Sequence, residues 1–175
     1  MPAVVLVGCS DDPGDEDEGS TSAATLAPEV CPSEQPVLRV DLIDDAVAAL
    51  EAERGPGQRY FEINATDDLV NLFVVGDADG EVVPYVFLGG ELSSEAPATG
   101  AEGNTFTADR LAFDPLKVTS CVADRLEAAT LIAFEVLAGA DGNVQYSVIT
   151  RSTAGGRLIS TVGPAGAIVG VQAVG

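Results

Sequence analysis

The sequence predicts an α+β fold of two tandem units, each with one helix followed by an antiparallel meander, with the helices packed on one face of the sheet. Three observations lead to this prediction. The 175 residues suffice for one compact domain or two small repeats. Apolar residues recur at helical spacing in two places, and β-rich segments separated by short turns follow each of them.

The first unit is expected over residues 35–113. Residues 37–40 are expected to form a short strand, Asp41 is a plausible N-cap, and the helix should end at Gly55. The apolar residues of the helix follow the i, i+3, i+4, i+7 pattern of one buried face: Ile43, Ala46, Val47 and Leu50. Three strands are then expected at residues 59–64, 69–75 and 82–88.

The second unit is expected over residues 114–175. Asp114 is a plausible N-cap, and the proline after it suits the first turn of a helix. The apolar stripe of this helix consists of Val118, Cys121, Val122, Leu126 and Ala129. Four strands follow, at residues 131–137, 143–151, 158–162 and 167–171.

The two units also share a short sequence pattern. A β-rich segment, the tripeptide Ala-Asp-Gly and a second β-rich segment follow one another around residues 73–85 and again around residues 134–146. The shared order predicts a duplication in which the two sheets join edge to edge. Residues 89–109, rich in Gly, Ser, Thr, Ala and Glu, are expected to be a long surface loop.

This order of elements resembles the small helix-then-sheet modules of the PepSY and β-lactamase-inhibitor-protein-like groups. The resemblance implies an extracytoplasmic protein that binds or inhibits another protein. It assigns no site residue, because the likeness is one of element order without a diagnostic motif.

Residues 6–9, Leu-Val-Gly-Cys, resemble a bacterial lipobox, which implies that Cys9 is lipidated after cleavage of residues 1–9. No Lys or Arg precedes Cys9 and the apolar stretch is short, so this is expected to be a truncated signal peptide. The alternative is that residues 4–7 form a short buried strand that ends at a free thiol. The lipobox interpretation places the protein on the extracytoplasmic face of the cell membrane, where the lipid is its only membrane contact.

Residues 10–34 are expected to be a disordered acidic tether, because they carry few bulky apolar side chains to bury. With Cys9 lipidated, Cys31 and Cys121 remain as a pair in an oxidising compartment and are expected to form a disulfide. The alternative is two buried thiols that behave as small hydrophobic side chains.

The chain carries 28 acidic and 8 basic residues, for a formal net charge of −20. Such a field disfavours binding to nucleic acid or anionic lipid and favours basic partners. The same acidity is also explained by solubility or by adaptation to salt.

The sequence predicts no enzyme, cofactor or metal site. It contains no histidine and one lysine, Lys117, so it offers no Ser-His or Cys-His pair and no support for a Ser-Lys dyad. The segment Asp77-Ala78-Asp79-Gly80 begins like a calcium loop but lacks the later ligands, and an Asp-Gly hairpin turn explains the same residues.

Aromatic residues on the expected strands are candidates for contacting a partner if they face outward: Tyr60, Tyr85, Phe87 and Tyr146. The alternative is that they belong to the core. The sequence thus favours a lipid-anchored module that binds an envelope or secreted protein. The other hypothesis is a carrier of a small or lipidic ligand in a cavity between sheet and helices. The identity of the partner and the oligomeric state do not follow from the sequence.

Overall fold

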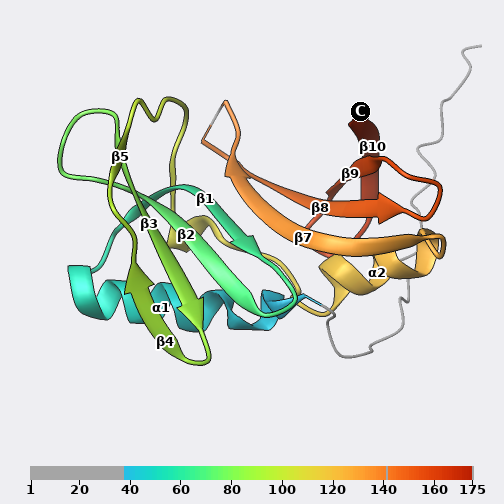
Figure 1. Cartoon of the computed structure of the whole chain (residues 1–175), viewed down its shortest axis with the longest axis horizontal. Helices are drawn as coiled ribbons and strands as arrows, with labels where there is room; N and C mark the ends of the chain where they lie inside the picture. The colour runs from blue at the N-terminus through green and yellow to red at the C-terminus, as the bar shows by residue number, and fades with distance from the viewer. Residues whose placement is uncertain (1–37, 141, 175) are drawn as a thin grey trace, which may run out of the picture.

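The computed structural model describes residues 38–140 and 142–174, which form an α+β fold of one large antiparallel sheet and two α-helices (Figure 1). The helices are α1 (Ile43–Arg54) and α2 (Lys117–Arg125), with short 3-10 helices η1 (Arg39–Leu42) and η2 (Ala108–Arg110). The strands are β1 (Arg59–Ala65), β2 (Leu69–Val75), β3 (Glu81–Leu88), β4 (Glu91–Ser94), β5 (Ala98–Thr99), β6 (Phe106–Thr107), β7 (Ala129–Ala138), β8 (Val144–Ser152), β9 (Arg157–Val162) and β10 (Ile168–Val174). The predicted α+β class is confirmed, and strands dominate it.

The strands follow the order β10-β9-β8-β7-β1-β2-β3-β4, with β5 paired to β3 and β6 paired to β1. The first long strand after each helix, β1 after α1 and β7 after α2, therefore lies at the centre of the sheet. β1 and β7 pair antiparallel, with Ile63 opposite Val136 and Ala65 opposite Phe134. This pairing joins the strands that follow α1 to the strands that follow α2 in one continuous sheet.

One face of the sheet packs on the helices and forms the core. Ile63, Ala65, Phe134 and Val136 point to this face and are fully buried. They belong to one hydrophobic cluster with the apolar stripes of both helices, and Figure 1 shows α1 and α2 below the same side of the sheet. The predicted stripe of α1 is confirmed, since all four of its residues are buried.

Several expected boundaries were wrong. Residues 39–42 form η1 instead of a strand, because the Arg39 N–H donates to the Thr66 carbonyl and Val40 turns into the core. The N-cap position of α1 is Leu42, without a side-chain hydrogen bond. Helix α2 ends at Arg125, so Ala129 starts β7.

The expected loop at residues 89–109 contains β4, β5, β6 and η2. β3 and β4 form a hairpin through Gly89 and Gly90, which both have the positive φ that such a tight turn requires. β6 then pairs beside β1, so the segment carries short strands that join the sheet, whereas most of its residues are exposed at the surface as expected.

The turn between β9 and β10 closes against the start of α2. The Asp114 N–H donates to the Pro164 carbonyl, and Asp114 Oδ1 accepts from the N–H groups of Leu116 and Lys117. The N-cap position of α2 is Leu116, so the expected N-cap at Asp114 was placed two residues too early, although its carboxylate still accepts from two N–H groups where the helix begins.

Candidate binding face of the sheet

The face of the sheet opposite the helices carries a row of polar side chains across five neighbouring strands. Cross-strand partners run from Asn71 to Asn64, then to Glu135, Ser147 and Thr161. We call these five residues the polar row. Their strand neighbours on each side point into the core, which fixes the direction of the row away from the helices.

Hydrogen bonds order one end of the row. Asn71 Nδ2 donates to Asn64 Oδ1 at 2.7 Å, and Asn64 Nδ2 donates to Glu62 Oε1 at 2.7 Å. Glu62 lies between Phe73 and Leu137 on the adjacent strands, so an oriented carboxylate sits between two partly buried apolar side chains. A surface of this kind combines a fixed polar group with apolar contact area.

Glu135 has the least satisfied carboxylate of this face. It is half-buried, and it makes no side-chain hydrogen bond or ion pair with any residue in the described part of the chain. Burial raises the pKa of Glu135 above its usual value, and the nearby negative charge of Glu62 raises it further. A cation placed between Glu62 and Glu135 would favour the ionised carboxylate and so oppose this rise in the pKa of Glu135.

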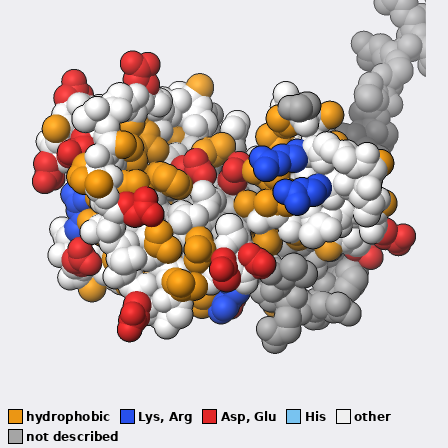
Figure 2. All heavy atoms as spheres, viewed as in Figure 1, with side chains coloured by type: hydrophobic (Ala, Val, Ile, Leu, Met, Phe, Trp, Pro, Cys, Tyr) orange, Lys and Arg blue, Asp and Glu red, His pale blue; other side chains and the backbone are white. Residues whose placement is uncertain are grey.

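The space-filling view shows the same chemistry at the level of the surface. Figure 2 shows acidic side chains among hydrophobic ones where the β1–β4 side of the sheet meets the β7–β10 side, with two basic side chains over β8 and β9. The middle of the helix-free face is thus negative and partly apolar.

The four aromatic residues predicted to contact a partner lie elsewhere. Tyr60, Tyr85, Phe87 and Tyr146 are at most 5% exposed and point into the core. The expectation that they face outward was wrong, because Tyr85 and Phe87 lie opposite the buried Leu72 and Val70.

A bulge explains why the strand pattern around Tyr60 misleads. The register of β1 shifts between Tyr60 and Glu62, so simple alternation does not continue through the strand. Tyr60 and Ile63, three residues apart, both face the core, and Glu62 and Asn64 face away from it.

The hydroxyl groups of the three tyrosines have different surroundings. The Ala112 N–H donates to Tyr146 Oη at 3.0 Å, and Arg54 Nη1 donates to Tyr85 Oη at 3.4 Å. The buried hydroxyl of Tyr60 has no partner within the described ranges.

Two of the three cysteines, Cys9 and Cys31, lie outside the described residues, so lipidation of Cys9 stays a prediction. Cys121 of α2 is buried beside the β9–β10 turn and is disulfide-bonded. Its pairing with Cys31 stays a prediction as well, because the bond extends beyond the part of the chain that is described.

The remaining expectations concern metals and membranes. No group of three or more His, Cys, Asp or Glu side chains in residues 38–140 and 142–174 is arranged to hold a metal ion. In the Asp77–Gly80 turn, Glu81 Oε2 accepts from the N–H groups of Asp77 and Ala78, and Gly80 has a positive φ, as a hairpin turn requires. Over the same residues, neither helix is long and apolar enough to cross a membrane.

Sequence reasoning missed the polar row. The available signal was the presence of Asn and Glu in the middle of otherwise apolar strands, where these residues are disfavoured. Comparisons with protein-family models, curated proteins and solved structures give no significant match to this chain. The interpretation of the helix-free face therefore depends on its geometry.

Proposed function

We propose that this protein is a lipid-anchored, extracytoplasmic and non-enzymatic binding module that recognises an envelope or secreted protein through the helix-free face of its sheet. Its recognition centre is the carboxylate pair of Glu62 and Glu135, into which the partner inserts a lysine or arginine side chain. The observation that carries the proposal is the half-buried, unpaired Glu135 beside a second carboxylate.

Energetics favour this interpretation. A half-buried carboxylate beside a like charge destabilises the folded protein unless a cation compensates for it. Phe73 and Leu137, which flank Glu62, supply the apolar contact that excludes water around such an ion pair. The net charge of −20 adds long-range attraction for a basic partner.

We further propose that the fold arose by duplication of one helix-plus-meander unit. The order of one helix and then several strands occurs twice, and β1 and β7 occupy equivalent central positions in the strand order. Under this proposal Glu62 and Glu135 come from the two copies, and the recognition centre exists only because the units join at their first long strands.

The alternative of a ligand carrier gains no support from the layer between sheet and helices. Large side chains fill that layer with no exposure to solvent, among them Tyr60, Phe134 and Leu50. We therefore keep the binding module as the single proposed function.

Site-specific photo-crosslinking in intact cells tests it. A photoreactive residue replaces Thr161, the exposed end of the polar row, and in a second sample it replaces Ala48 on the exposed side of α1. We expect a protein adduct from position 161 and none from position 48. Loss of a desolvated ion pair weakens binding by at least about tenfold, so Glu135→Gln should remove most of the adduct.

The matched control is Asp124→Asn, which removes one charge from an exposed position of α2. This variant should crosslink as the parent chain does. Equal adduct yields from positions 161 and 48, or equal losses in the two charge variants, would contradict the proposal. Mass spectrometry of Cys9 from the membrane fraction tests the anchor separately, because an unmodified thiol removes the proposed localisation and leaves the binding face untouched.

A further inference from the structure

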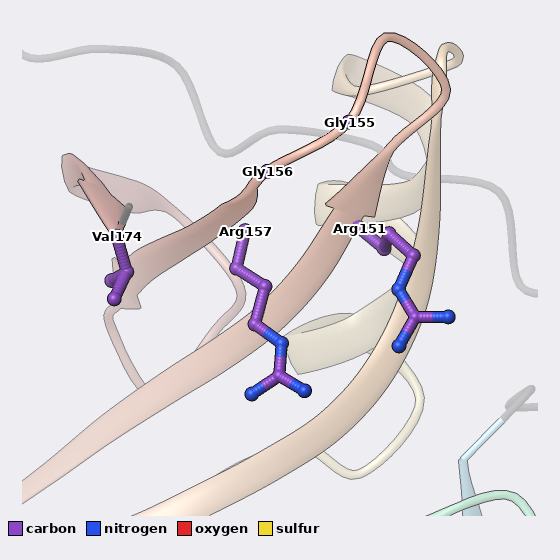
Figure 3. Close-up of a pocket in the computed structure, with 5 residues that line it drawn as sticks. All are labelled: Arg151, Gly155, Gly156, Arg157 and Val174. Atoms are coloured by element: carbon purple, nitrogen blue, oxygen red, sulfur yellow. The ribbon is translucent and has the colours of Figure 1, made fainter.

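Two arginines face each other on the hairpin formed by β8 and β9. Arg151 and Arg157 are direct cross-strand partners, and the turn that joins their strands contains Gly155 and Gly156. Figure 3 shows the two side chains on the same side of the sheet, with Val174 of the neighbouring strand β10 alongside. These five residues line a hollow of about 380 Å³.

Two neighbouring arginines without an acidic partner among the described residues are unusual in so acidic a protein. The chain has only 8 basic residues against 28 acidic ones, and the other six basic residues all contact a partner. Arg151 and Arg157 make no side-chain hydrogen bond or ion pair within residues 38–140 and 142–174. Like charges directly opposite each other in a sheet destabilise it. An arrangement that costs stability while acids are abundant points to a function outside folding.

The pair is separate from the proposed recognition centre. Arg151 and Ser147 of the polar row share the helix-free face but lie four residues apart along β8, about 13 Å at the usual rise of a strand. The carboxylates near Ser147 are therefore too far away to neutralise the guanidinium groups.

We propose that this hollow binds the phosphate group of a phosphomonoester. A guanidinium presents a planar fork of N–H donors that suits phosphate oxygens, and two forks supply the two positive charges that a phosphate dianion requires. Val174, 40% exposed, offers an apolar wall to the organic part of the ligand. Apart from the chain neighbours of each glycine, no heavy atom lies within 4 Å of the positions where a Cβ on Gly155 or Gly156 would stand, so no other part of the chain crowds the turn at the edge of the hollow.

Small ligands fit this site better than extended polyanions. The two arginines are a local positive spot on a chain with a net charge of −20, which repels long anionic surfaces. The phosphate belongs either to a soluble phosphomonoester or to the headgroup of a lipid such as phosphatidic acid, and the test separates these sources.

The test measures thermal stability of the full chain at constant ionic strength and about pH 8, where a phosphomonoester is a dianion. Inorganic phosphate and phenyl phosphate should both raise the unfolding temperature, and phenyl phosphate should do so at lower concentration because its ring contacts Val174. Arg151→Ala and Arg157→Ala should each weaken phosphate binding by at least about tenfold. Arg110→Ala is the matched control, since Arg110 is exposed and pairs with its neighbour Asp109.

A second readout reports on the pair without a ligand. In the absence of phosphate, Arg151→Ala should raise the unfolding temperature by about 1–4 °C, because it removes the repulsion from Arg157. A variant that merely damaged the fold would lower that temperature instead.

Vesicle flotation shows whether the bound phosphate group comes from a soluble phosphomonoester or from a lipid headgroup. Binding of phenyl phosphate without enrichment on phosphatidic acid vesicles, relative to phosphatidylcholine vesicles, supports a soluble ligand. Enrichment that Arg151→Ala abolishes supports a lipid headgroup in the same hollow. The proposal is overturned if phosphate acts no differently from chloride at equal ionic strength, if acetate binds as tightly as phosphate, or if Arg110→Ala loses as much affinity as the two site variants.

Discussion

Replacing Tyr60 by phenylalanine should stabilise the protein, whereas the same replacement at Tyr146 should destabilise it. Both side chains are buried, with 0% and 4% of their surface exposed. The Tyr146 hydroxyl accepts a hydrogen bond from the Ala112 N–H, and the Tyr60 hydroxyl has no partner among the described residues. The two variants remove the same atom from similar burial and differ in the bond that is lost.

The expected change in the free energy of unfolding for Tyr60→Phe is the sum of two contributions. A buried, unpaired hydroxyl costs about 1–3 kcal/mol of folding free energy, which Tyr60→Phe recovers. The variant leaves a void of about 10–15 Å³, which costs about 0.3 kcal/mol at the usual penalty per volume. Tyr60→Phe should therefore gain about 0.7–2.7 kcal/mol, while Tyr146→Phe loses about 0.5–1.5 kcal/mol with its hydrogen bond.

Equilibrium unfolding in urea measures both changes, with an unchanged m-value as the check that the unfolded states are comparable. Tyr85→Phe is a further control and should follow Tyr146, because the Tyr85 hydroxyl accepts from Arg54. If Tyr60→Phe is as destabilised as the other two variants, the Tyr60 hydroxyl has a partner and the reasoning is refuted.

The titration of Tyr60 offers a second check on the same variant. Burial, and then the negative charge of Glu51, raise the pKa of Tyr60 from 10.0 to about 12. The unfolded chain thus loses this proton at a lower pH than the folded chain does. Stability contributed by the neutral hydroxyl falls as the pH rises from about 10 to about 12, and Tyr60→Phe should remove that part of the decline.

Three further predictions concern other positions. Gly166→Ala should lower the free energy of unfolding, measured in urea, by at least about 2 kcal/mol more than Gly156→Ala does. Both glycines have φ +85°, but only at Gly166 does the new Cβ meet the first backbone carbonyl of α2. Equal losses of stability would contradict this packing. Glu135→Gln should raise the unfolding temperature at neutral pH. It should also reduce the gain in stability that the parent chain shows as the pH falls toward the ordinary carboxyl pKa of 4.5, because the raised pKa means that the folded chain binds the proton more tightly than the unfolded chain. An unchanged dependence of stability on pH would argue against a perturbed Glu135. Thr150→Val should stabilise the folded protein by about 1 kcal/mol, because the Thr150 hydroxyl is buried without a partner among the described residues. Thr66→Val should destabilise it, because that variant loses the hydrogen bond to Asp68. A loss of stability in both variants would show that the Thr150 hydroxyl has a hydrogen-bond partner.

The long strands and the buried face of α1 were the parts of the fold that the sequence predicted best. The stripe from Ile43 to Leu50 specifies one buried face through local spacing alone, and each of its residues is buried in the structure. The ends of elements were predicted less well, because they depend on distant groups. The start of the described chain became helical where its backbone bonds to Thr66, a contact that no local pattern contains.

The two candidate sites also differ in whether local sequence or long-range strand pairing brings their residues together. Asn64 and Glu135 are neighbours only because β1 pairs with β7, which lies far from it in the sequence, and the register of that pair is set by packing of the two core faces. A one-residue slip would turn every side chain of one strand to the opposite face, so no inspection of either strand alone assigns this contact. The bulge after Tyr60 adds another shift that alternation does not reveal.

Arg151 and Arg157 are the opposite case, because a short hairpin fixes their register locally. The Ala-Gly-Gly turn expected from the sequence lies between the two arginines, and strands joined by a short turn place the flanking residues opposite each other. Their pairing can therefore be inferred from the sequence alone, whereas the hollow cannot, since its third wall is Val174 from β10. Local turns thus predict which charges meet, and only the full sheet determines whether the place where they meet has room for a ligand.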